Sequence, residues 1–276
     1  MRRLRPLRVR SASLSMLALA ALAASAALAT SAALATLAMA VSAEAAPVSA
    51  EDLAKRLATG ARSEADKARD AERRPAEVIA FLGIGPGMTV LDLIAAGGWY
   101  SEVLAEAVGP QGKVYAQNTA AALQLREGVN EKAISARLAG GRLPNVVRLD
   151  REIGELGLAP GSVDAAFTAE NFHDVYNGYG AEAAARFLAA VKTVLRPGGL
   201  LAIEDHVGVA GADNTALHRI EPEHVEELAV AAGFVVEGRS SVLAHPEDDH
   251  TRSVFDPSIR GRTDRFVLKL RKPNGR

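Results

Sequence analysis

Residues Val90–Tyr100 read VLDLIAAGGWY and decide the fold of this chain. A short apolar run ends in Asp92, and small residues with the pair Gly97-Gly98 follow before a helical pattern begins. This order predicts a strand, a tight turn and the start of a helix. Small residues in such a turn let the backbone approach a ligand, and the free N–H groups of the helix start can bind it. We therefore expect an α/β domain with a ligand site at this turn.

Strand-like and helix-like segments alternate after this turn, which is typical of a parallel sheet with helical crossovers. The expected strands span residues 88–94, 112–117, 145–149, 163–169 and 200–205, followed by two β-rich segments at about 234–243 and 264–271. The expected helices span Trp99–Val108, part of 119–138 and about 180–194. A further helix is bounded by Pro222, which suits a first helical turn, and by Gly233.

Composition divides the chain into three parts. Residues 1–46 begin with five arginines, continue with an apolar Ala/Leu/Ser-rich run and end near Ala43-Glu44-Ala45, which resembles a signal-peptidase site. We expect a cleaved signal and export to the periplasm; an uncleaved anchor facing the periplasm and a start at Met39 are the alternatives. Residues 47–84 are charged and Ala-rich and predict an N-terminal helical segment. Residues 85–276 then form the α/β domain.

Charge and cysteine content exclude several classes of function. The chain has a net charge of −1, and residues 1–46 hold five arginines and one glutamate, a net of +4, so the rest carries about −5. No basic surplus remains to bind a phosphate backbone, which argues against nucleic acid as a partner. The absence of cysteine rules out disulfides, a thiolate nucleophile and cysteine-bound metals. Membrane contact is expected only through residues 1–46, if they stay uncleaved.

Four phrases carry a resemblance to a known family: RPAEVIAFLGIGPGMTVLDL, ENFHDVYN, LHRIEP and VFDPSIRGRTDRFVLKLRKP. In order and spacing, about residues 60–273 resemble class I S-adenosylmethionine (SAM)-dependent methyltransferases, and more narrowly a bacterial group of exported, predicted methyltransferases. The resemblance implies a Rossmann-like seven-stranded sheet with its last strand antiparallel and helices on both faces. It also implies SAM as cofactor and methyl transfer to a small-molecule substrate.

The resemblance implies that Asp92 and the turn Ala96-Gly97-Gly98 face the methionine end of SAM. Ile94 and Ala96 stand where the family has glycines, so the glycine motif is degenerate. A branched side chain such as that of Ile94 disfavours a positive φ and occupies space next to the ligand. The competing interpretation is a methyltransferase-fold binding protein that has lost SAM-dependent activity.

Three further positions are expected at the cofactor. Asn118 stands where the family has a carboxylate that binds both ribose hydroxyls, and a neutral amide makes the weaker contact. The alternative role for Asn118 is to cap the next helix. Asp150 matches the family's acidic residue near the adenine amino group, or else it caps the turn that follows. Asn171 belongs to the polar segment after the fourth strand.

Catalytic candidates come from the same segment, since carboxyl ends of parallel strands face the ligand crevice. His173 could take a proton from a substrate nucleophile, with Asp174 orienting its imidazole. Alternatively, His173 is hydrogen-bonded within a loop and Asp174 is a cap. Glu204-Asp205-His206 ends the next strand at the same edge. The spacings of the histidines fit no compact ligand pattern, so no metal site is expected; those weighed were His206, His218, His245 and His250.

Overall fold

The computed structural model describes residues 46–275, so the predicted signal segment lies outside the described residues except for Ala46. Within residues 46–275, seven strands form one sheet in the order β3-β2-β1-β4-β5-β7-β6. Strands β1 to β5 run parallel, and β7 runs antiparallel to both of its neighbours. The strands are β1 (Thr89–Leu93), β2 (Lys113–Asn118), β3 (Val146–Asp150), β4 (Val163–Ala169), β5 (Leu195–His206), β6 (Val235–Ser240) and β7 (Arg265–Arg271). The predicted fold is confirmed.

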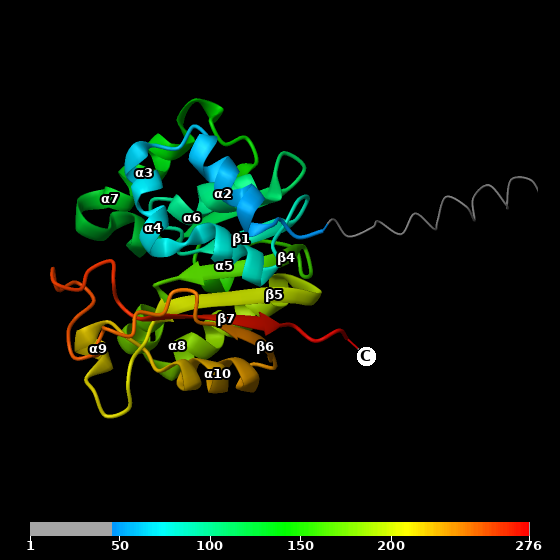
Figure 1. The fold of residues 1–276 in the computed structure, drawn as a ribbon. Coiled ribbons are helices and arrows are strands. Elements are labelled where there is room, and N and C mark those ends of the chain that lie inside the picture. The colour runs from blue at the N-terminus through cyan, green and yellow to red at the C-terminus, as the bar shows by residue number, and fades with distance from the viewer. Residues whose placement is uncertain (1–45, 276) are drawn as a thin grey trace, which may run out of the picture. The chain divides into compact units, whose positions relative to one another are not determined.

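Helices cover both faces of the sheet (Figure 1). Along β1, Val90 packs into one core with the first helix group, whereas Leu91 and Leu93 pack into the other core. This alternation buries β1 on both faces, as expected of a central parallel strand. The first group is α2 (Ala50–Thr59), α5 (Pro75–Leu82) and α6 (Trp99–Val108); the second is α8 (Phe172–Val194) and α10 (Pro222–Ala231).

The order of the strands fixes the position of the ligand crevice. From β1 the chain proceeds outward to β2 and β3 on one side, then returns to place β4 and β5 on the other. In open α/β sheets, ligands bind beyond the carboxyl ends of the strands where the order reverses. That point lies between β1 and β4, so the turn after Leu93 and the segment after Ala169 form its two walls.

Several elements depart from the sequence-based boundaries. Helix α8 begins at Phe172 rather than near residue 180, and Gly180 breaks it with a φ of 81°. His173 and Asp174 therefore lie in the first turn of a helix and not in a loop. Helix α7 (Ala120–Leu138) is also interrupted, by four non-helical residues over 125–128. The expected helix start at Pro222 is correct, and Pro75 likewise starts a helix.

The N-terminal helical segment and the late loop both reach the carboxyl edge of the sheet. Between α2 and α5 lie the short helices α3 (Glu64–Ala68) and α4 (Asp70–Arg73). The late loop runs from residue 244 to 262, after the short helix α9 (Asn214–Leu217). Figure 1 shows α3, α4, α7 and α9 at the same end of the sheet. Of these pieces, α4, α7 and the late loop supply outer walls of the crevice.

Candidate functional site

The turn after β1 has the backbone of a glycine-rich loop, although two of the three glycine positions hold Ile94 and Ala96. Ile94 has a φ of 53° and Ala96 a φ of 50°, and Gly98 follows with 75°. A β-branched residue in this left-handed region is a genuine outlier, and even alanine is disfavoured there. The three positions where the family has glycine therefore adopt the glycine conformation, at a cost in backbone strain.

Gly97 and Gly98 are required for a different reason. A Cβ on Gly98 would lie 2.5 Å from Ile134 Cδ1, and one on Gly97 would lie 2.9 Å from the Ala133 Cβ. Both contacts are shorter than carbon atoms allow. These two glycines therefore permit the second half of α7 to pack directly over the turn.

Two buried amides at the end of β2 hold the turn in place. Ile94 N–H donates to Gln117 Oε1 over 3.0 Å. Asn118 is bonded twice to Ala96: its Oδ1 accepts from the Ala96 N–H at 2.8 Å and its Nδ2 donates to the Ala96 carbonyl at 3.1 Å. Both amide side chains belong to fully buried residues. The polar atoms of Asn118 are thus committed to the turn.

Asn118 and Asp150, which end β2 and β3, make contacts other than the caps that were considered as their alternative roles. Thr119, not Asn118, caps α7, since its hydroxyl accepts from the Ala122 N–H at 3.1 Å. Asp150 is 40% exposed at its side chain and accepts from Arg148 Nε at 2.7 Å. Neither Asn118 nor Asp150 lines the cavity above the turn. Their assignment to the cofactor stays a prediction.

A cavity of about 370 Å³ lies over the turn. Asp92 at its base is 2% exposed and accepts from the Ser101 hydroxyl at 2.6 Å. Burial raises the pKa of Asp92 to about 7, and the Ser101 hydrogen bond offsets only part of that shift. Asn171 lines the opposite wall and donates to the Ala169 carbonyl at 2.6 Å. The lining also includes Ile94, Ala95, Ala96, Gly97, Trp99, Tyr100, Asn130, Ala133, Arg137 and Glu170.

A larger cavity of about 670 Å³ adjoins the first, and Arg69, Arg73 and Glu170 line both. Its remaining wall comes from α4, the end of β5, the late loop and the residues that lead into and begin β7, namely Glu72, His206, Val254, Phe255, Pro257, Arg260, Gly261, Thr263 and Arg265. Arg69 and Arg73 were not predicted as site residues, because basic residues in a charged helical segment are usually solvated. The only available signal was their four-residue spacing, which places them on one helical face.

Buried charges connect the two cavities. Glu170 accepts from Arg73 and, at 2.7 Å, from Arg265 Nη1. Burial alone would raise the pKa of Glu170, but Arg73, His206 and Arg265 outweigh it and hold the pKa far below its ordinary value. Glu204, which is fully buried, accepts from the Tyr100 hydroxyl at 2.6 Å. Burial raises the pKa of Glu204 to about 6, although Arg265 and Arg73 oppose it.

His173 lies between two carboxylates. Its Nδ1 is 2.6 Å from Asp205 Oδ1, and its Nε2 is 3.2 Å from Asp174 Oδ1. The fully buried Asp205 also accepts from the His173 backbone N–H at 2.8 Å. The residue that orients the ring from Nδ1 is therefore Asp205, whereas Asp174 faces Nε2, the atom expected to take a substrate proton.

This arrangement affects the proposed base. Burial would lower the pKa of His173, but the two carboxylates outweigh burial and raise it to about 10. The ring therefore carries a proton at neutral pH and would have to lose it before acting as a base. His206 is the contrasting case: burial lowers its pKa to about 4, and its Nδ1 lies 3.0 Å from the Thr263 hydroxyl. His206 presents a neutral imidazole to the larger cavity.

Some arginines after residue 218 form structural contacts, and others line the larger cavity. Arg219 is fully buried and pairs with Asp248 at 2.9 Å, so it ties the late loop to the chain before α10. Arg265 and Arg260 line the larger cavity. Arg262 is bonded to the Ser258 carbonyl at 2.6 Å in the exposed loop.

Comparisons with known proteins agree with the observed fold. A family model described as a methyltransferase domain matches residues 91–203. A search of curated proteins gives no match. A solved SAM-dependent methyltransferase from Aquifex aeolicus is 24% identical with a TM-score of 0.54, and the match covers 72% of this chain and 89% of that one.

Two further structures share the fold. The [4+2]-cyclase SpnF is 19% identical with a TM-score of 0.57, over 74% of this chain and 82% of its own. A putative sarcosine dimethylglycine methyltransferase from Galdieria sulphuraria is 16% identical with a TM-score of 0.54, over 74% and 86%. Identities this low demonstrate the fold alone. The family model spans less than half of the chain, so together these comparisons show that the chain has the class I methyltransferase fold.

Proposed function

We propose that this protein transfers a methyl group from SAM to a small anionic acceptor. The observation that supports this most directly is the turn at Ile94, Ala96 and Gly98, which keeps the left-handed backbone of a glycine-rich loop beneath a cavity. Strain of this kind persists only where the surrounding structure imposes it, and it clusters at functional sites. A turn without a ligand would have no reason to retain it.

The smaller cavity fits the cofactor's methionine end. Asp92 and Asn171 offer polar groups from opposite walls, and the turn offers its backbone between them. When bound, SAM supplies a methyl group activated on a sulfonium. The contribution of the chain is to bind and orient the reactants and to exclude water around them.

The larger cavity suits an acceptor that carries negative charge. Four arginines and two glutamates line it, which leaves a positive balance. Arg265 is 3% exposed, and its Nε has no hydrogen-bond partner. A buried donor without a partner costs free energy that an anionic ligand would recover.

The protonation states favour an acceptor that arrives already deprotonated, such as a carboxylate. His173 holds a proton at neutral pH, and His206, with a pKa of about 4, is a weak base. An anionic nucleophile needs neither of them as a base. In that case His206 would contact the acceptor as a neutral hydrogen-bonding group.

Calorimetric titration of the full chain with SAM and with its demethylated product tests this proposal. We expect micromolar binding of both, lost in Asp92→Ala and retained in Asp150→Ala, whose side chain lies outside the cavity. Radiolabelled methyl transfer to a panel of small carboxylates would then identify the acceptor. Lack of binding to either cofactor form would overturn the proposal.

The second candidate is a binding protein with the methyltransferase fold. It is favoured by the hydrogen bonds of Asn118 to Ala96, because Asn118 stands where the family has its ribose-binding carboxylate and its side chain is bonded to the turn instead. Under this alternative, SAM does not bind wild-type protein. Replacing Ile94 and Ala96 with glycine would then create binding if those side chains are the obstacle.

We also propose that the chain is exported to the periplasm, as in the exported bacterial group that it resembles. The support is the arginine-rich start, the apolar run and Ala43-Glu44-Ala45. Among the described residues, no helix is both long enough and apolar enough to cross a membrane. N-terminal sequencing of the envelope fraction tests this proposal: a mature protein beginning near Ala46 or Pro47 supports export, and an intact Met1 in the cytosol contradicts it.

A further inference from the structure

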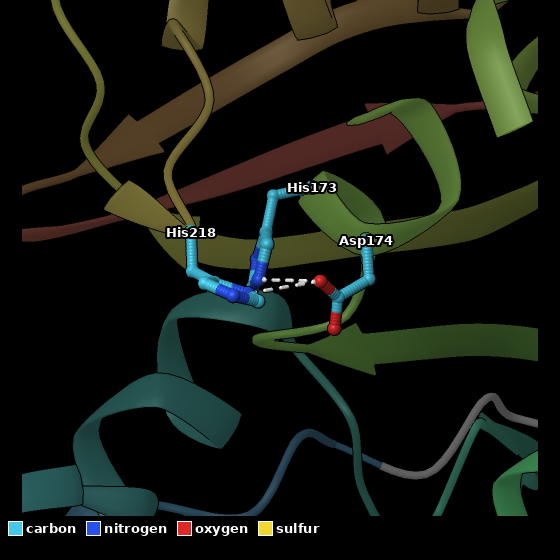
Figure 2. Close-up of side chains that lie close together, drawn as sticks. All are labelled: His173, Asp174 and His218. Atoms are coloured by element: carbon cyan, nitrogen blue, oxygen red, sulfur yellow. Dashed lines mark hydrogen bonds and ion pairs between the residues drawn. The ribbon is translucent and has the colours of Figure 1, made fainter. Parts of the chain in front are cut away.

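Three potential metal ligands, His173, Asp174 and His218, lie close together next to the larger cavity. His218 follows Asp174 by 44 positions in the sequence. Asp174 Oδ1 lies 3.2 Å from His173 Nε2 and 3.2 Å from His218 Nδ1. Figure 2 shows the Asp174 carboxylate directed at both rings. All three ligand atoms lie within 4.8 Å of one another.

These separations are those of atoms that share an ion. Ligands about 2.0–2.1 Å from one metal, at the angles of tetrahedral or octahedral coordination, lie about 2.8–3.4 Å apart. Both carboxylate–imidazole separations fall within this range. The third edge, between the ring nitrogens of His173 and His218, is no longer than 4.8 Å. Sharing an ion would require His218, whose side chain is 39% exposed, to move towards His173.

The surroundings of His173 match those of a metal-binding histidine. Such residues usually donate their second ring N–H to a carboxylate, which fixes the tautomer and aims the other nitrogen at the ion. Asp205 provides this contact at 2.6 Å from Nδ1 and is itself fully buried. Nε2 is thereby turned towards Asp174 and His218.

The net charge of the cluster and the backbone conformation of His218 also favour a bound cation. Metal binding displaces the proton from His173 Nε2, and the two carboxylates with two neutral imidazoles then carry −2, which a single divalent cation balances. His218 is held at a φ of 54° at the end of α9. Strained residues of this kind are frequent at ligand-binding positions.

We propose that His173 Nε2, Asp174 Oδ1 and His218 Nδ1 bind one divalent first-row transition-metal ion, such as zinc. Two imidazoles and a carboxylate suit these ions, whereas magnesium and calcium prefer oxygen ligands alone. The site adjoins the acceptor cavity: the His218 ring lies 4.8 Å from that of Phe255, which lines the cavity. Metal binding here does not depend on methyl transfer, so the two proposals fail separately.

Spectroscopy and calorimetry on the full, untagged chain test the site. Chelator-treated protein is titrated with Zn²⁺, and Co²⁺ is used as a visible-absorption probe of the ligand set. We expect one equivalent of Zn²⁺ per chain and Co²⁺ bands typical of nitrogen and oxygen ligands. The variants His218→Asn and Asp174→Asn should each weaken binding at least tenfold, and both change side chains that are well exposed.

The matched control is His250→Asn, which removes another histidine paired with an aspartate, at 3.0 Å from Asp264 Oδ2. It should bind Zn²⁺ like the wild type. Thermal unfolding monitored by circular dichroism verifies that each variant is folded. Absence of stoichiometric binding, or equal binding by wild type and His218→Asn, would mean an adventitious ion only and would overturn the proposal.

Discussion

The two halves of the crevice are built from different interactions. On the side of β1 and β2, neutral amides hold the turn: the side-chain oxygens of Gln117 and Asn118 accept hydrogen bonds from its backbone N–H groups. On the side of β4, β5 and β7, the site is held by buried ion pairs, since Glu170 and Glu204 both pair with Arg265. The first half fixes a backbone shape, and the second fixes an electrostatic field.

This difference shows how a site can keep its form while its sequence changes. Where backbone shape matters, Ile94 and Ala96 can replace glycine because amides from β2 hold the strained conformation. Where charge matters, each buried group needs a partner, since an unpaired ion in the interior is far more costly than a strained dihedral. The charged half should therefore tolerate substitution least.

The largest effect is expected from breaking the charged half. Arg265→Met leaves Glu170 and Glu204 with Arg73 as their remaining cation, and we expect it to lower the free energy of unfolding by about 3–5 kcal/mol. Urea denaturation measures the change. Arg239→Met, which removes a cation that is 64% exposed and paired with Glu226, should cost less than about 1 kcal/mol. Equal losses in the two variants would refute the contrast.

The next effect concerns Asp92, the buried acid beneath the turn. Its pKa rises from 3.8 to about 7 on folding, so Asp92 favours the folded state at low pH and this stabilisation is lost as the pH rises from about 4 to about 7. Asp92→Asn stays neutral, and its advantage over the wild type should grow to as much as about 4 kcal/mol at pH 8.

Unfolding curves recorded between pH 4 and pH 8 measure this advantage. Asp249→Asn is the control, because the Thr251 hydroxyl lowers the pKa of that exposed carboxyl and no gain in the same direction is expected. An Asp92→Asn advantage that does not change with pH would show that the carboxyl ionises freely in the folded protein.

A smaller effect tests the neutral half directly. Asn118→Asp restores the family's acidic residue but removes the donor to the Ala96 carbonyl and places two acceptors together. We expect a loss of about 1–3 kcal/mol in the free energy of unfolding. Asn274→Asp, in the exposed C-terminal tail, should change nothing measurable. A stable Asn118→Asp variant would mean that the amide does not hold the turn.

The smallest effect is a gain. Ala96→Gly removes the strain of a φ of 50° and should stabilise the protein by about 1 kcal/mol. Ala95→Gly, one residue earlier and outside the positive-φ set, should destabilise it by about 0.5–1 kcal/mol. Thermal unfolding of the pair decides the point, because strain at Ala96 is disproved if both variants move in the same direction.

Periodicity and turn residues were enough to predict an α/β domain with a parallel sheet, whereas the antiparallel last strand was predicted from the family resemblance. Strand β4 and helix α6 have the predicted bounds, and the start at Pro222 is correct, because local apolar spacing and the fixed φ of proline act over a few residues. The first part of α8, Phe172–Tyr179, was not predicted as helix, since its polar sequence resembles a loop.

The site was only partly predictable, because its decisive contacts join distant parts of the chain. Asp92 and Asn171 were assigned to the cofactor site, and both line the smaller cavity. The engagement of Asn118 with Ala96 could not be foreseen, since an amide at a strand end gives no sign of its partner. Likewise, the meeting of His173 with His218 depends on how α9 folds back, which ligand spacing in the sequence cannot reveal.

The central claim is that the strained turn is kept in shape to hold the cofactor. A crystal structure of the protein soaked with the demethylated product of SAM tests it most directly. The account predicts the bound nucleoside over Asp92 and Asn171, with Ile94 and Ala96 still at positive φ. A cavity filled instead by the Ile94 side chain and α7, with no bound nucleoside, would contradict it.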